Sequence, residues 1–192
     1  MRYPSDQKAK AKAAIIEAGA RTLKQKGFNG VGVDALAASA GATSGAFYSN
    51  FAGKEELLKE VIELYLGNPF IDPDVEGVPA QRQELKTYLQ LYVSGGHRDD
   101  PASGCVMPAL TADVARSHDS VRQVYEDRIK LLVSKMAPIL SGSQEERERK
   151  AWTIVSIMVG SVSIARAVLN KAEAARIIGA ALSSALALVD QP

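Results

Sequence analysis

The chain has 192 residues, of which 46% are hydrophobic and 23% are charged, and its net charge is +1. This is the composition of a folded globular protein, and it excludes a largely disordered chain, a collagen-like repeat and a disulfide-rich scaffold. The single cysteine cannot form an intramolecular disulfide, so nothing in the sequence requires an oxidising compartment.

The distribution of charge is more informative than its sum. Within residues 1–30, seven Lys or Arg face two Asp or Glu, so this end carries +5 and the remaining chain −4. A basic end on an acidic body favours a polyanionic partner, although a solvated helix face explains it equally well. The N-terminal residues do not form a secretory signal. Arg166, Lys171 and Arg176 interrupt the apolar C-terminal stretches, so we expect a cytoplasmic protein that does not span a membrane.

Apolar residues recur with helical spacing along the chain, and runs of alternating β-branched residues are missing. We therefore predict an all-α fold of about nine helices without strands. Gly27 and Gly41 are expected to end helices, and the prolines at 69, 73 and 79 predict a linker. The predicted helices cover 6–26, 33–40, 44–50, 54–66, 81–94, 104–117, 119–140, 143–170 and 171–189.

Two short predicted helices, over 33–40 and 44–50, are separated by a turn that contains Gly41. This arrangement is a helix-turn-helix unit, which we place at about 32–51. Phe47 and Phe51 are four residues apart and can anchor the second helix inward. The remaining face is small and polar, which allows the backbone to approach DNA closely. An ordinary helical hairpin with a polar surface is the alternative interpretation.

The sequence from Ile15 to Ile62 resembles the DNA-binding domain of the TetR family of bacterial transcription regulators, and the resemblance extends over about 9–69. The landmarks are Gly27-Phe28, Leu36-Ala37, Gly41, Gly45, Phe47-Tyr48, Phe51, Lys54-Glu55 and Leu57-Leu58. The resemblance implies a DNA-binding domain at 9–69 and an effector-binding and dimerisation domain at 80–192. It also implies a homodimeric repressor, not an enzyme and without a cofactor, that a small-molecule effector releases from a palindromic operator.

The resemblance assigns DNA contacts to seven residues. Thr43 would cap the recognition helix and touch phosphate, Tyr48 and Lys54 would contact phosphate, and the other four residues would face bases. Ser44 stands where the family often has Lys, and Gly32 stands where the family usually has a hydroxyl residue that caps the second helix. Because long base-reading side chains are absent, recognition of sequence-dependent DNA shape is expected to contribute more than usual to specificity. The predicted DNA-contacting residues are Thr43, Ser44, Ala46, Tyr48, Ser49, Asn50 and Lys54.

Aromatic and flexible apolar residues at helical spacing predict an effector pocket in the second half of the chain. It would suit an apolar or aromatic molecule, and an anionic one if Arg128 faces inward. Core residues that satisfy their own hydrogen bonds are an equally good interpretation. The predicted lining residues are Leu85, Tyr88, Leu89, Tyr92, Met107, Leu110, Val124, Tyr125, Arg128, Trp152 and Val155.

Cys105 lies at the start of a predicted helix, where a helix N-terminus favours the reactive thiolate. A sensor of electrophiles or oxidants on the same scaffold is therefore an alternative, against the simpler interpretation of a small buried residue. His97 and His118 are expected in loops and show no metal-binding spacing, so we predict no metal site. A helical enzyme that uses Cys105, or a protein-binding adaptor, explains the segment 33–51 less well.

The helices 143–170 and 171–189 carry broad apolar faces with many small residues. Pairing with the same helices of a second copy would bury these faces in a four-helix bundle. Burial within one chain is the alternative. We therefore predict a homodimer through these two helices.

Overall fold

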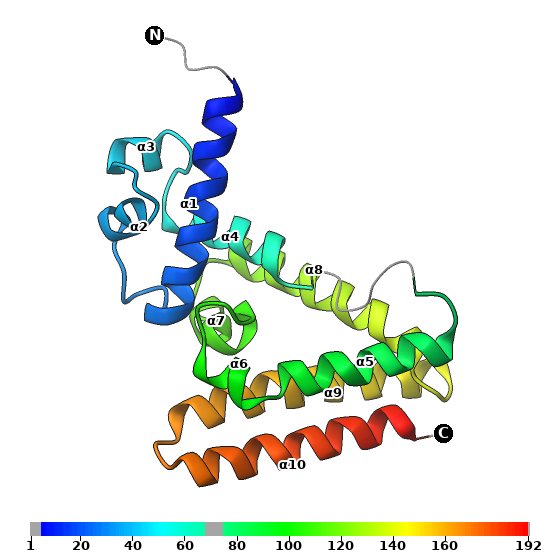
Figure 1. The fold of residues 1–192 in the computed structure, drawn as a ribbon. Helices are drawn as coiled ribbons and strands as arrows, with labels where there is room; N and C mark the ends of the chain where they lie inside the picture. Colours follow the sequence, from blue (N-terminus) through cyan, green and yellow to red (C-terminus); the bar gives the residue numbers. More distant parts are fainter. Residues whose placement is uncertain (1–4, 68–74, 192) are drawn as a thin grey trace. The chain divides into compact units, whose positions relative to one another are not determined.

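The computed structural model describes residues 5–67 and 75–191, and over this range the chain is all-helical with no strand (Figure 1). Ten α-helices and one short 3₁₀ helix, η1, are described. Their bounds are α1 Ser5–Lys26, α2 Val33–Ser39, α3 Ser44–Tyr48, α4 Lys54–Tyr65, α5 Val78–Tyr92, α6 Gly95–Asp99, α7 Val106–Val114, α8 Asp119–Met136, η1 Ala137–Ile139, α9 Gln144–Ala167 and α10 Lys171–Asp190. The all-α prediction is confirmed.

The structure adds a short helix to the predicted set. The segment after Val93 was expected to be a break with His97 in a loop, but His97 lies in α6. Ser94 explains the difference, because its hydroxyl oxygen caps α6 by accepting the His97 amide at 3.1 Å. Most of the predicted linker, including Pro69 and Pro73, lies outside the described residues. Pro79 belongs to the first turn of α5, where a missing N–H has no cost.

The described residues fall into two compact units. The first unit holds the residues up to Leu66 together with Pro101–Glu126, and the second holds Gly67–Asp100 and the residues from Asp127 onward. The helix α8 is continuous and contributes residues to both units. The functional division predicted at 9–69 and 80–192 stays a prediction.

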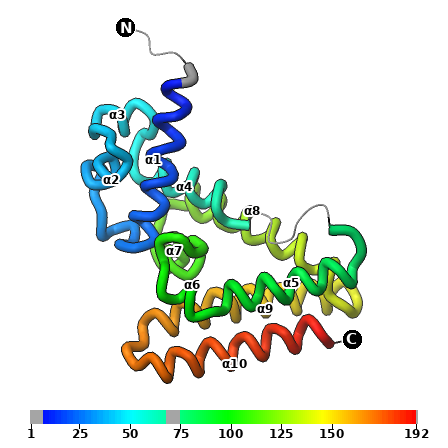
Figure 2. The backbone as a smooth tube through the Cα atoms, in the orientation of Figure 1, coloured from blue at the N-terminus to red at the C-terminus, as the bar shows by residue number. Residues whose placement is uncertain are grey.

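In the first unit, α1 packs against α2, α4 and α7 (Figure 2). Its C-terminal end is fixed by two polar contacts. The ammonium of Lys24 donates to the Gly104 carbonyl at 2.7 Å, and Asp113 accepts the Phe28 amide at 3.2 Å. The core is formed by fully buried side chains: Ile15, Leu23, Leu36, Phe47, Phe51, Leu57, Leu58 and Ile62.

In the second unit, α9 and α10 run antiparallel side by side, and α5 packs against α10 (Figure 1). Helix α9 begins with a capping box, in which the Ser143 hydroxyl accepts the Glu146 amide and the Glu146 carboxylate accepts the Ser143 amide. Asn170 ends the short turn and caps α10. Arg166 of α9 holds α6 by donating to the carbonyls of His97 and Arg98.

Helix α10 is long and apolar enough to span a membrane by length and composition alone, yet only 22% of its 18-residue apolar window is buried. The expectation that charged residues make the C-terminal segment too polar to cross a membrane is therefore wrong as far as length and composition are concerned. One such helix indicates little by itself, because core helices of soluble proteins and signal sequences pass the same test. Helix α10 thus presents apolar surface that the described residues leave open.

Candidate nucleic-acid interface

Helices α2 and α3 form the predicted helix-turn-helix unit. Gly41 takes a φ of +66° in the turn, a conformation that favours glycine. Thr43 is the N-cap of α3, and its hydroxyl oxygen accepts the Ala46 amide at 3.2 Å. Gly32 caps α2 without a side-chain hydrogen bond, as the sequence predicts. The turn and the cap therefore fix where α3 begins.

Two phenylalanines set the orientation of α3. Phe47 and Phe51 are fully buried, and their ring centres lie 5.3 Å apart. Tyr48, the next residue, is 58% exposed, and its ring lies edge-on to that of Phe47. The small polar face of α3 consequently points away from the core, as a helix that approaches a DNA groove requires.

Several predicted base-facing groups make hydrogen bonds inside the unit. The Ser44 hydroxyl donates to the Asp34 carboxylate of α2 at 2.5 Å, and the Ser49 hydroxyl donates to the Ala46 carbonyl. The Asn50 amide nitrogen donates to the same carbonyl at 2.8 Å, while its Oδ1 is buried without a partner. These hydroxyls can still accept, but their protons are already used.

Lys54 makes contacts that the sequence did not predict. Its ammonium donates to the carbonyls of Phe28 at 2.8 Å and Val31 at 2.9 Å. The loop between α1 and α2 is therefore fastened to the start of α4. Sequence reasoning gave Lys54 a phosphate contact only, because nothing in the pattern shows that two carbonyls lie within its reach.

A shallow cavity of about 510 Å³ opens at the start of α4. Its lining includes Lys54 and Lys59 together with Glu55 and Glu56. The Glu56 carboxylate accepts a hydrogen bond from the Ala52 amide, so this backbone N–H just before α4 is already paired. A phosphate that approaches this N-terminus would therefore meet a carboxylate as well as two ammonium groups.

The predicted effector residues belong to both units. Met107, Leu110, Val124 and Tyr125 are in the first unit, and the others are in the second. Tyr125 shares a hydrogen bond of 2.7 Å with Thr111, and burial raises the pKa of its phenol. Within the second unit, Trp152 lines a groove between α8 and α9. The pocket itself stays a prediction.

Cys105 is the N-cap of α7. Its sulfur accepts the Met107 amide at 3.4 Å, and the residue is half-buried. The prediction that this cysteine opens a helix is confirmed. Among the described residues, no group of three or more His, Cys, Asp or Glu side chains is placed to hold a metal ion.

Comparison with known proteins identifies the segment that carries this geometry. Residues 15–61 match the model of the family described as bacterial regulatory proteins of the tetR family. This range runs from the buried Ile15 of α1 to Val61 of α4, and it includes all of α2 and α3. Residues 15–61 therefore have the helix-turn-helix domain of the TetR type. The family that this segment matches is one of transcriptional regulators and not of enzymes.

Two curated relatives are similar to this chain. An uncharacterized HTH-type transcriptional regulator of Bacillus subtilis, YerO, is 34% identical over 121 residues, which is 59% of this chain and 40% of the relative. The transcriptional regulator AcuR of Cereibacter sphaeroides is 28% identical over 119 residues, 58% of this chain and 52% of the relative. The alignments thus span about half the length of these relatives.

Solved structures share the fold over nearly the whole chain. Reduced NemR of E. coli has a TM-score of 0.74 at 17% identity and covers 95% of this chain and 98% of its own. A TetR-family regulator from Cytophaga hutchinsonii has a TM-score of 0.72 at 19% identity and full coverage of both chains. At these identities the likeness establishes the fold alone, and it extends beyond the matched segment over nearly the whole chain.

Proposed function

We propose that this TetR-family protein is a cytoplasmic, homodimeric repressor that binds a palindromic DNA operator and is released by a small-molecule effector. One observation carries the DNA-binding part of the proposal. The short helix α3 is anchored by the buried Phe47 and Phe51 and projects an exposed Tyr48 from a helix-turn-helix unit. Tyr48 packs one edge against Phe47 but is 58% exposed, and a tyrosine hydroxyl suits a phosphate oxygen.

The predicted DNA face has few side chains that can read bases. Ala46 offers only a methyl group, and the hydroxyl protons of Ser44 and Ser49 are used internally. Phosphate contacts would position the helix, and Asn50 and the small side chains would allow close approach to base edges. Sequence-dependent DNA shape would then supply part of the specificity.

The proposed dimer uses α9 and α10. On α9, Ile164 is 56% exposed, and a Cβ added at Gly160 or at Gly179 of α10 would meet no atom within 4 Å. Glycine inside a helix lowers stability by about 1 kcal/mol relative to alanine. No contact within the described residues requires glycine at either position. A helix of a second copy that packs closely against these positions would require a residue without a side chain. Two recognition helices could then enter major grooves about 34 Å apart.

Effector control is the least direct part of the proposal. The predicted lining residues, from Leu85 on α5 to Val155 on α9, are largely apolar and would suit an apolar or aromatic molecule. An effector that binds better to a protomer arrangement with the wrong recognition-helix spacing would shift the population away from DNA.

A thiol-based version has one observation in its favour. Cys105 caps α7 with its sulfur toward the Met107 amide, and backbone amides stabilise a thiolate. Addition of an electrophile to this sulfur would remove the cap. Treatment with N-ethylmaleimide should then release DNA from the natural chain but not from Cys105→Ser, whereas a reversible effector should act on both.

The proposal is tested by selecting binding sites from a random DNA pool with the purified protein and measuring affinity by mobility shift. We expect an enriched palindrome and binding with two protomers per site. Tyr48→Ala should weaken binding, while the exposed α5 control Leu91→Ala should not. Failure to enrich any DNA, or equal binding by Tyr48→Ala, would contradict a DNA-binding role for this face.

A further inference from the structure

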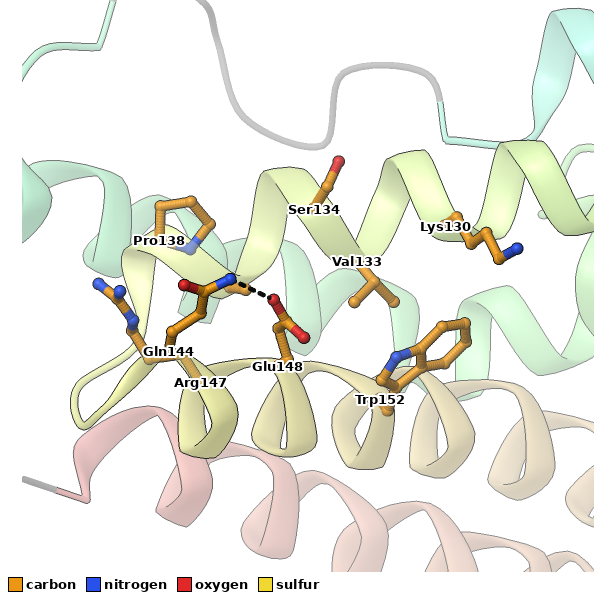
Figure 3. Close-up of a pocket in the computed structure, with 9 residues that line it drawn as sticks. Lys130, Val133, Ser134, Pro138, Gln144, Arg147, Glu148 and Trp152 are labelled. Carbon is orange, nitrogen blue, oxygen red and sulfur yellow. Dashed lines mark hydrogen bonds between the residues drawn. The ribbon is translucent and has the colours of Figure 1, made fainter.

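A groove in the second unit lies between α8 and the start of α9 and has a volume of about 470 Å³ (Figure 3). This is within the size range of small-molecule sites in proteins. Its apolar part comes from Val133, Ala137 and Pro138, and its aromatic part from Trp152, the only tryptophan of the chain. Trp152 is 40% exposed, so a large indole surface is available to a ligand.

The walls of the groove are fixed by hydrogen bonds outside it. Arg82 of α5 donates to the Ile139 carbonyl at 3.2 Å and to the Ser141 hydroxyl at 2.8 Å. Lys150 donates to the Ser141 carbonyl at 3.1 Å. The turn that joins η1 to α9 is therefore held from two sides, and a pre-formed site loses less entropy when it binds a ligand.

The charged groups in the groove favour an anion. Lys130 and Arg147 line it together with one carboxylate, that of Glu148. Gln144 donates its amide to Glu148 at 3.1 Å, which reduces the capacity of that carboxylate to repel an anion (Figure 3). Arg147 is half-buried at the end of the groove away from Trp152. A planar guanidinium suits a carboxylate better than any other common ligand group except phosphate.

We propose that this groove binds a planar aromatic carboxylate, with its rings against Trp152 and its carboxylate toward Arg147. Arg147 and Trp152 are five residues apart on α9, which corresponds to a rise of about 7.5 Å and a rotation of about 140° around the helix axis, so they form the two edges of the groove side of α9. A two-ring acid is long enough to extend from one edge toward the other. The groove is separate from the predicted interior pocket, of whose residues it contains only Trp152. The proposal concerns the protein alone and does not rest on DNA binding.

The groove also differs from the proposed dimer face. Trp152 and Ile164 are twelve residues apart, which places them about 120° apart around the axis of α9. A second copy seated on Ile164 therefore leaves the groove side of the helix open. This distinction gives the test a control, because ligand binding and dimerisation should respond to different substitutions.

The test uses biphenyl-4-carboxylate as the probe and biphenyl-4-carboxamide as its neutral counterpart. Because Trp152 is the only tryptophan, its emission reports on the groove alone. We expect saturable quenching by the acid, a Kd at least about fivefold higher for the amide, and the same ratio by calorimetry. Equal binding of the two compounds, no binding, or binding without a change in Trp152 emission would overturn the proposal.

Two further variants complete the test, one that removes a positive charge from the groove and one that removes a negative charge. Arg147→Gln should raise the Kd of the acid about fivefold and leave the amide unchanged, whereas Glu148→Gln should hold or lower the Kd of the acid. Both side chains lie at the surface, and circular dichroism checks that both variants fold. Survival of the acid preference in Arg147→Gln, or conversion of that variant to a monomer, would assign the groove to another role.

Discussion

The Lys54 ammonium lies 4.4 Å from the centre of the Phe28 ring and donates a hydrogen bond to the carbonyl oxygen of the same residue. This contact joins the start of the α1–α2 loop to the first residue of α4. The same ammonium also reaches the Val31 carbonyl. Lys54, to which the family resemblance assigns a phosphate contact, therefore also stabilises the loop between α1 and α2 in the unit that contains α3.

Substitution of Lys54 separates these two roles. Lys54→Ala should lower the free energy of unfolding by about 1 kcal/mol, because hydrogen bonds to a charged group and one cation–π contact are lost from a half-exposed site. Lys59→Ala, in the same cavity, should change it by less than about 0.5 kcal/mol. Urea denaturation measures both values. An equal effect of the two substitutions would mean that the Lys54 contacts add no stability.

The salt dependence of DNA affinity shows whether Lys54 also contacts phosphate. If it does, Lys54→Ala should reduce the slope of log K against log salt by about 0.9 per protomer, and by about twice that for a dimer. An unchanged slope with weaker binding would assign Lys54 to the positioning of α3 alone.

Loss of the Thr43 cap should weaken α3. Thr43→Ala removes the acceptor of the Ala46 amide and should cost about 1 kcal/mol of stability. Thr43→Ser keeps the hydroxyl and should retain most of the stability and the DNA affinity. Thermal unfolding and mobility shift measure the pair. If Ser behaves like Ala, the methyl group rather than the hydroxyl matters at this position.

The dimer is tested by placing charge on the open face of α9. Ile164→Arg, or Ala181→Arg on α10, would bury an unpaired cation in the proposed interface and should give monomers by light scattering. Leu91→Arg on α5 introduces the same charge at another exposed leucine and should leave the dimer intact. A folded, dimeric Ile164→Arg variant would rule out this face.

Stability should fall at acidic pH through Glu146. The Ser143 amide and hydroxyl hold the pKa of the Glu146 carboxyl below its ordinary value, and this carboxyl is at the surface. The carboxylate form therefore stabilises the α9 cap above the ordinary Glu pKa of about 4.3, and this contribution is lost as the pH falls through the lowered value.

Glu146→Gln removes this titration. The variant should show a weaker loss of stability between neutral pH and about pH 3 than the natural chain, measured as the denaturation midpoint at each pH. Glu145→Gln makes the same change of charge one residue earlier and should retain the natural pH dependence. Identical profiles for all three proteins would show that the cap does not depend on ionisation.

The helices were predictable where local chemistry decides them. Helical spacing located α4 and α9, and Gly27 and Gly41, which were expected to end helices, both take a positive φ after a helix. The short helix α6 was missed because two adjacent glycines indicate a break, although the Ser94 cap is a local contact. The Arg166 contacts that also stabilise α6 come from a distant part of the chain and could not be predicted.

The candidate site was less predictable than the fold. Spacing identified α3 and its inward Phe47, but it could not show that Ser44 donates to Asp34 or that Lys54 reaches two carbonyls. Such contacts join residues 10 to 26 positions apart. The groove beside Trp152 escaped prediction for the same reason, because it arises from the turn that Arg82 holds in place.

Helix α3 has only five residues, far fewer than an isolated helix needs to persist in water. Its order therefore depends on the Thr43 cap, the Ser44–Asp34 hydrogen bond and the burial of Phe47. Local opening of this segment should need less free energy than opening of α1 or α4, and its amide hydrogens should exchange sooner. Part of the free energy of operator binding would then go into holding α3 closed, and the bound DNA would slow exchange there more than elsewhere.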